Sequence, residues 1–172
     1  MRARAARLDA IGPAIALAFV ALAIVGPFLS PFAPERIDLG HDLEAPGGAH
    51  LLGTAENGVD ILSVLLAGAR LSGTIALMAV GLSVAVGVLL GLWAGLRGGA
   101  AEATFGGLAD LVQCFPSIVL HIAILALVAR PGVLHVALAL GASGWVIHFR
   151  IARAQALSLR EQDFVLAARA LG

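Results

Sequence analysis

The chain has 172 residues, of which 60% are hydrophobic and 13% are charged, and its mean hydropathy is +0.98. This composition is too apolar for a soluble domain of that size and is typical of a membrane protein. Acidic and basic residues balance, and every basic residue is an arginine, so the lysine of a phosphate-binding P-loop is missing and ATP hydrolysis by this chain alone is not expected.

Four stretches without Asp, Glu or Arg are long enough to cross a hydrocarbon core, which takes about 20 helical residues. They cover residues 10–34, 71–96, 111–129 and 131–149. The basic start "MRARAAR" resembles a signal peptide, but the apolar run that follows is longer than the usual h-region of about 7 to 15 residues. We therefore expect an uncleaved first span and a polytopic, all-α transmembrane helix bundle.

The connection between the first two spans, residues 31–70, is acidic and rich in proline and glycine. Its Asn57-Gly58 pair predicts a turn, and a helix is expected to begin near Asp60. The residues after Asp60 share an apolar face, which suits an interfacial helix. They are equally well explained as the first turns of the second span.

Three glycines recur every fourth residue in the second span: Gly87, Gly91 and Gly95. This spacing puts them on one helix face, where small residues let another helix backbone approach closely. The pattern predicts a packing face, and packing within the same subunit is favoured over a dimer contact.

The third span carries three residues that need an explanation. His121 lies near its middle, where a titratable group indicates either a substrate pathway or a histidine bonded to a neighbouring helix; the second interpretation is favoured, and no metal site is predicted. Pro116 either starts the helix cleanly or bends it. Cys114 is expected to be a small buried hydrophobic residue. No motif of a catalytic site or cofactor site is present, so we expect neither catalytic residues nor a cofactor.

The last stretch, "SLREQDFVLAARALG", has helical spacing after a long apolar run. Ser158 and Glu161 fit a capping box and predict that a helix begins there. Such a helix would present either a face for a protein partner or a face for the membrane surface. The candidate contact residues are Arg160, Glu161, Asp163, Phe164, Ala167, Ala168 and Gly172.

The arginines predict the orientation of the spans. If the N-terminus is cytoplasmic, eight arginines lie on that side and three outside, in agreement with the positive-inside rule. The eight are Arg2, Arg4, Arg7, Arg97, Arg150, Arg153, Arg160 and Arg169, and the three are Arg36, Arg70 and Arg130. The last segment is then cytoplasmic and residues 31–70 are extracytoplasmic.

Four segments in this order resemble the permease subunits of ATP-binding-cassette importers of the dipeptide, oligopeptide and nickel group, in particular their C-type member. They are "HLLGTAENGVDILSVLLAGAR", "GVLLGLWAGLRGG", "LADLVQCFPSIVL" and "GWVIHFRIARAQALSLREQDFVLAARALG". The resemblance is close over residues 50–172 and loose over the first span. It implies a type I importer permease fold, with the first four spans and the start of the EAA loop, a cytoplasmic segment that docks on the ATPase.

In that family the EAA motif would place its two alanines at Ala167 and Ala168 and its glycine at Gly172. The implied partners are a second permease subunit, ATPase subunits that hydrolyse ATP, an extracytoplasmic solute-binding protein and membrane lipid; no nucleic acid is expected. The implied location is the bacterial inner membrane, with the substrate left open between peptides and nickel chelates. A non-transporting membrane scaffold is the alternative.

The expected organisation has three parts: residues 1–30 as the cytoplasmic N-terminus and first span, 31–70 as the outer loop with an interfacial helix, and 71–172 as a partial permease domain whose EAA loop starts within 150–172. Leu166 stands where the family usually has the EAA glutamate, and Ala55 stands where an aspartate is usual. Family members continue through further spans, so we expect the chain to be a fragment of a longer reading frame.

Overall fold

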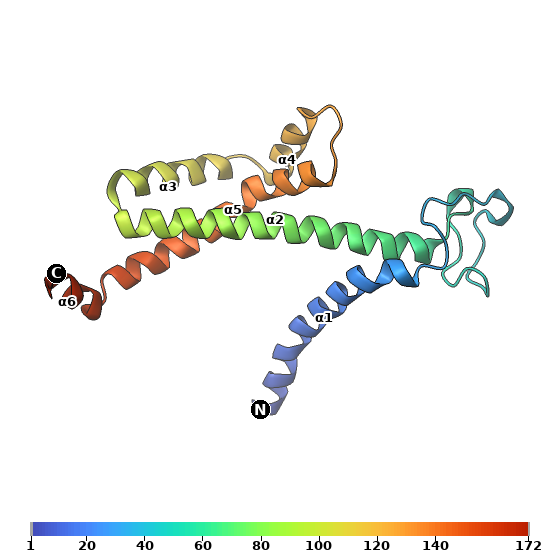
Figure 1. Cartoon of the computed structure of the whole chain (residues 1–172), viewed down its shortest axis with the longest axis horizontal. Coiled ribbons are helices and arrows are strands. Elements are labelled where there is room, and N and C mark those ends of the chain that lie inside the picture. The colour runs from blue at the N-terminus through green and yellow to red at the C-terminus, as the bar shows by residue number, and fades with distance from the viewer. Residues whose placement is uncertain (1, 172) are drawn as a thin grey trace. The chain divides into compact units, whose positions relative to one another are not determined.

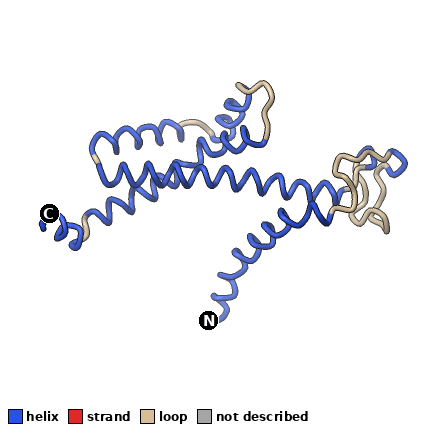
Figure 2. The backbone as a smooth tube through the Cα atoms, in the orientation of Figure 1, coloured by secondary structure: helices blue, strands red, loops and turns tan. Residues whose placement is uncertain are grey.

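The computed structural model describes residues 2–171, with side chains for residues 11–168 and 171, and these residues form an all-helical protein (Figures 1 and 2). The predicted fold class is therefore confirmed. In the described residues β pairing is limited to one isolated antiparallel bridge, between Thr54 and Asp60. The α-helices are α1 (Arg2–Leu29), α2 (Ile61–Arg97), α3 (Gly99–Gln113), α4 (Ser117–Ala126), α5 (Val133–Arg160) and α6 (Asp163–Leu171), with the short 3-10 helices η1 (Leu39–His41) and η2 (Glu56–Gly58).

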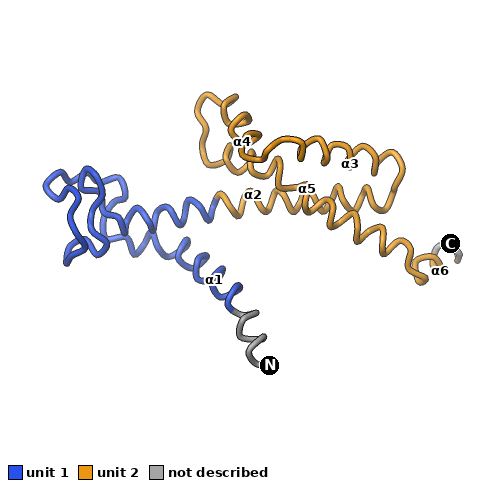
Figure 3. The backbone as a smooth tube through the Cα atoms, turned by 180° about the vertical axis from the view of Figure 1, so that it is seen from behind, with its two compact units in different colours: residues 1–74 blue, residues 75–172 orange. Residues whose placement is uncertain are grey.

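The chain divides into two compact units, residues 1–74 and 75–172, and the boundary lies within α2 (Figure 3). The first unit holds α1, the loop with η1 and η2, and the start of α2. The second holds the rest of α2 and α3 to α6. Each unit is described by itself below.

Helix α2 is much longer than a membrane crossing needs. Its 37 residues span about 55 Å at 1.5 Å per residue, against about 30 Å for a hydrocarbon core. It begins at Ile61, so the residues after Asp60 are its first turns and not a separate interfacial helix. The predicted turn before it is confirmed, because Asn57 and Gly58 both have positive φ, 64° and 69°.

The third predicted span, residues 111–129, is divided at Pro116, where α4 starts and the chain bends, as the two interpretations of this proline allowed. Helix α3 begins earlier, at Gly99, and ends at Gln113, and α4 follows at an angle of 89° to it. The cause is Pro116, which has no N–H to donate and disfavours helical backbone in the residue before it. Cys114, expected to be buried, is exposed at the end of α3.

Helix α5 corrects two further expectations. It starts at Val133 and continues to Arg160, beyond the predicted end of the fourth span at residue 149. Ser158 therefore lies inside α5, and the predicted capping box of Ser158 and Glu161 does not start a helix. The physical reason is packing, since Trp145, Phe149 and later alanines of α5 are buried on one face and hold the helix together through this region.

The described part of the chain contains three helices long and apolar enough to cross a membrane, within α1, α2 and α5, and a fourth crossing if α3 and α4 form one bent span. In the second unit, α2, α3 and α5 pack around a small core. Its buried residues are Ala94, Ala109, Trp145, Val146 and Phe149. Trp93 and Phe105 add a tilted aromatic contact between α2 and α3, with ring centroids 5.3 Å apart.

The glycine stripe of α2 lies against α5 of the same chain. A Cβ atom added to Gly91 would lie 2.5 Å from the Phe149 carbonyl oxygen and 2.8 Å from Ala152 Cβ. One added to Gly95 would lie 2.6 Å from Ala156 Cβ. Real Cβ atoms do not approach this closely, so glycine is what permits the contact between the two backbones.

A second pair of glycines, on α5, completes this crossing. A Cβ added to Gly141 would lie 2.7 Å from Leu82 Cδ2, and one added to Gly144 would lie 2.5 Å from Ser83 Oγ. Both helices therefore contribute small residues to the interface. The regular spacing of its glycines indicated the packing face of α2, whereas the contacts of Gly141 and Gly144 on α5 were not predicted.

Candidate functional site

The described candidate contact residues lie at the end of α5, in α6 and in the short turn between these two helices. Arg160 is the last residue of α5, and a Cβ built on Gly98 would lie 3.1 Å from its Nη1 atom, so its guanidinium reaches the turn between α2 and α3. Glu161 caps α5 with φ −92° and ψ 0°. The Gln162 N–H bonds the Leu159 carbonyl at 3.2 Å, and the Gln162 carbonyl in turn accepts the first bond of α6.

Helix α6 presents an unusual amount of apolar surface for its length. Asp163 opens it, where a carboxylate interacts favourably with the helix dipole. Phe164 and Leu166 are 66% and 51% exposed, and Ala167 and Ala168 are exposed beside them. Gly172, the last predicted contact residue, lies outside the described residues.

Two ion pairs connect α3 to α5 just before this end of the molecule. Arg150 Nη2 lies 2.7 Å from Asp110 Oδ1, and Arg153 bonds Glu102 through both Nε and Nη2, the former at 3.0 Å. Glu102, early in α3, pairs with the later arginine of α5, Arg153, and Asp110, late in α3, pairs with the earlier one, Arg150. This order is expected for antiparallel helices. The two pairs therefore fix the register of α3 on the segment of α5 that leads to α6.

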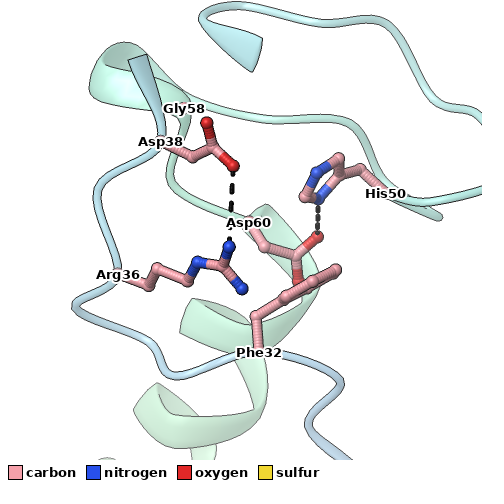
Figure 4. A pocket seen from close by; sticks show the side chains of 6 residues that line it. All are labelled: Phe32, Arg36, Asp38, His50, Gly58 and Asp60. Carbon is pink, nitrogen blue, oxygen red and sulfur yellow. Dashed lines mark hydrogen bonds and ion pairs between the residues drawn. The ribbon is translucent and has the colours of Figure 1, made fainter. Parts of the chain in front are cut away.

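A buried polar cluster orders the loop before α2, and Figure 4 shows part of it. Asp60 is 3% exposed; its Oδ2 accepts hydrogen bonds from the Ser63 N–H at 2.8 Å and the Ser63 hydroxyl at 2.7 Å, which caps α2. Its Oδ1 lies 2.9 Å from His50 Nδ1, and the His50 ring stacks on Phe32 at 4.8 Å. We call His50, Asp60, Ser63 and Phe32 the loop clamp.

Further hydrogen bonds and ion pairs connect the loop clamp to the residues around it. The Phe32 N–H bonds the Ser63 hydroxyl at 3.2 Å, so the end of the segment from α1 is held on the first turn of α2. Asp38, beside the clamp in Figure 4, lies 3.3 Å from His41 and 3.8 Å from Arg36. The cavity between these residues is about 10 Å³, which is room for one water molecule and not for a substrate.

Two carboxyl groups of this region have lowered pKa values. Burial by itself raises the pKa of Asp60, but the hydrogen bonds from Ser63 and His50 outweigh it, so the pKa lies below the ordinary 3.8. The hydrogen bond from His41 is the main cause that lowers the pKa of Asp38. Both carboxylates are therefore stabilised in the charged form by the folded loop.

We expect acid to loosen the loop clamp. Because the folded-state pKa of Asp60 is lowered, its carboxylate stabilises the fold above the ordinary value of 3.8, and this contribution is lost as the pH falls through the folded-state pKa. Amide hydrogen exchange of residues 32–60, corrected for intrinsic rates, should stay constant down to about pH 5 and accelerate below about pH 4. Loosening that is already complete near pH 6 would contradict this assignment and point to a histidine.

Comparison with known proteins then decides the family. Residues 87–172, which include the last part of α2 and all of α3 to α6, match the model of the binding-protein-dependent transport system inner membrane component. The chain belongs to this family. It is a multi-pass membrane protein of the permease type, and the non-transporting scaffold alternative has no support.

Individual relatives of this permease agree. The dipeptide transport system permease protein DppC of Alkalihalophilus pseudofirmus is 32% identical over 96% of this chain and 54% of its own length. The oligopeptide permease OppC of Bacillus subtilis is 31% identical over 100% of this chain and 56% of its own. The nickel permease NikC of Escherichia coli is 33% identical over 92% and 57%. The chain thus spans about half the length of these relatives, and the resemblance to peptide and nickel permeases is confirmed.

The loop clamp does not involve the side chains of its neighbours Ala55 and Val64. Ala55 is exposed and does not contribute a side chain to the clamp, and Val64 is 45% exposed on α2. Three of the clamp residues, His50, Asp60 and Ser63, lie in the motif "HLLGTAENGVDILS", yet their mutual contacts were not predicted. The spacing of a histidine, an aspartate and a serine within this motif was the available signal.

Proposed function

We propose that this permease is the C-type subunit of an ATP-binding-cassette importer and transports peptides, nickel chelates or related small solutes. The names of its relatives, which are permeases for dipeptides, oligopeptides and nickel, support this substrate range. A solute-binding protein would deliver the substrate from outside, and two ATPase subunits would supply the energy. The chain itself has no P-loop lysine and carries no catalytic role in this proposal.

The single observation that carries the proposal is α6. It is a nine-residue amphipathic helix that follows a long span directly and leaves its apolar side chains exposed. A helix of this kind needs a partner surface to cover the side that carries Phe164 and Leu171, which are 66% and 91% exposed. We propose that an ATPase subunit provides that surface, with Ala167 and Ala168 allowing close approach and Arg160, Glu161 and Asp163 as polar contacts at its edge.

The proposed topology follows from an even number of crossings. If α3 and α4 together form one bent span, the described helices cross the membrane four times and α6 lies on the same side as the N-terminus. The excess of arginine near the two chain ends supports a cytoplasmic location for both. The residues that precede the first span and residues 150–172 would then face the cytoplasm, and 31–70 would face the solute-binding protein.

A second permease subunit is proposed to complete the pathway. Helix α5 leaves Ile147 and Ile151 60% and 56% exposed. On α3, a Cβ added to Gly106 or Gly107 would meet nothing within 4 Å. These surfaces suit helices of another subunit or lipid. Movement of the spans between inward and outward access would be of the rigid-body kind.

The substitution Ala168→Glu tests the docking of α6. Because Ala168 is exposed, the larger charged side chain fits on this chain but obstructs a closely packed partner. We expect the amount of ATPase subunit that co-purifies with the permease to fall at least about tenfold, while the permease itself still accumulates in the membrane. Ala45→Glu, at an exposed position of the loop in the other unit, is the control and should leave co-purification unchanged. Undiminished co-purification of the Ala168→Glu variant would refute the proposed contact.

A further inference from the structure

Helix α4 carries a polar face in otherwise apolar sequence. Ser117 is its first residue and His121 follows one turn later, so the two lie on the same side of the helix. His121 Nε2 lies 2.6 Å from the Ser143 hydroxyl of α5, and both side chains are half-buried. This hydrogen bond accounts for one nitrogen of the ring and joins α4 to α5.

The second nitrogen of the ring is left available. The Ser143 hydroxyl lies 3.3 Å from the Leu140 carbonyl and can donate its hydrogen there. With that hydrogen committed, the serine oxygen accepts from His121, whose Nε2 must then carry the ring proton. In this neutral tautomer Nδ1 is a hydrogen-bond acceptor, and it has no partner among the described residues. The alternative arrangement, in which Ser143 donates to the ring, makes one hydrogen bond fewer.

The backbone that precedes this polar face is also irregular. Between α3 and α4 the helix is broken by 89°, and the residues of the break, Cys114 to Pro116, are exposed. Irregular backbone at membrane depth persists where it is covered by protein or lines a water-filled cavity. A polar nitrogen facing lipid would also be costly. By these two arguments, neither the break nor the second ring nitrogen of His121 suits a position against lipid.

We propose that His121, with Ser117 one turn away, contacts the transported solute, and that its Nδ1 accepts a hydrogen bond from an N–H group of that solute. The matching chemistry is an ammonium group or a peptide amide, both of which are donors. Ser143 is a positioning residue, which fixes the tautomer and the orientation of the ring. This inference rests on the proposed function, because it assigns residues to the pathway of that importer.

The test uses the assembled importer in vesicles with radiolabelled dialanine as the probe. Uptake and ATP hydrolysis are measured together, with the solute-binding protein saturated by dialanine. We expect His121→Phe to reduce dialanine transported per ATP about fivefold, the size of one lost hydrogen bond, while ATP hydrolysis stays near the wild-type rate. Ser143→Ala keeps the imidazole and should reduce the ratio clearly less.

The possible outcomes separate the inference from the proposed function. Equal losses in His121→Phe and Ser143→Ala, or uptake and ATP hydrolysis that fall in parallel, would mean that the pair only holds α4 to α5, and would overturn the inference. An unchanged ratio in His121→Phe would overturn it as well. If the unmodified importer shows no ATP-dependent uptake of dialanine, dipeptide transport is wrong, and the inference of a hydrogen bond to a dipeptide falls with it.

Discussion

Replacement of Gly91 by leucine is expected to disrupt the packing of α2 on α5. Even the first atom of a new side chain would lie 2.5 Å from the Phe149 carbonyl oxygen, 2.8 Å from Ala152 Cβ and 3.1 Å from the Arg153 nitrogen. Two of these three atoms belong to the backbone, so a rotamer change cannot relieve the clash. The helices must separate, and we expect a loss of about 3 kcal/mol or more in the free energy of unfolding.

The measurement is detergent-solubilised unfolding followed by tryptophan emission, because Trp145 is 7% exposed and lies at this crossing. The control is Gly81→Leu in the same helix, since a Cβ added to Gly81 would meet nothing within 4 Å. It changes the same residue type by the same volume and should leave the unfolding midpoint nearly unchanged. Similar destabilisation by both substitutions would mean that helix flexibility, and not the contact with α5, explains the role of Gly91.

The sequence predicted a packing face on α2 because helical spacing alone places Gly87, Gly91 and Gly95 on one face, but it did not predict which helix packs there. A local periodicity needs no knowledge of the rest of the chain. The apolar composition likewise predicted the helices, and the Asn57-Gly58 pair predicted the turn before α2. Each of these signals is contained in a few neighbouring residues.

The errors come from competition between local signals. Pro116 could start or bend a helix, while the apolar composition on both sides of it suggested one continuous span; the backbone constraint of proline prevailed. At Ser158 a good capping pattern competed with the buried face of α5, and packing prevailed. Neither conflict can be resolved by a pattern of single residues.

Contacts between distant residues could not be predicted at all. Glu102 and Arg153 are 51 positions apart, and Asp110 and Arg150 are 40 positions apart, so their pairing depends on the bend before α4 and the register of α5. The loop clamp also depends on tertiary structure, because the Phe32 N–H reaches Ser63 across the whole loop. The residues of these ion pairs and of the loop clamp can be read from the sequence, but their pairing can be known only from the folded structure.

Removal of the Asp60 carboxylate is expected to open the loop that precedes α2. Asp60→Ala leaves three donors without their acceptor in a buried place: the Ser63 N–H, the Ser63 hydroxyl and His50 Nδ1. Each unsatisfied buried group costs about 1 to 3 kcal/mol, so the loop should lose roughly 3 kcal/mol. Hydrogen exchange of residues 32–60 should then be accelerated about a hundredfold, while exchange in α5 stays unchanged.

Two further variants separate the capping role of Asp60 from its charge. Asparagine is among the best capping residues and would still cap α2 at this position, so Asp60→Asn should show a smaller acceleration. Below about pH 4 it should loosen less than the unmodified loop, because only Asp38 then contributes a lowered pKa. Glu56→Gln removes a carboxylate from an exposed position of the same loop and should leave the exchange unchanged. If Asp60→Ala and Glu56→Gln accelerate exchange equally, the loop responds to its total charge, and the buried clamp does not determine its order.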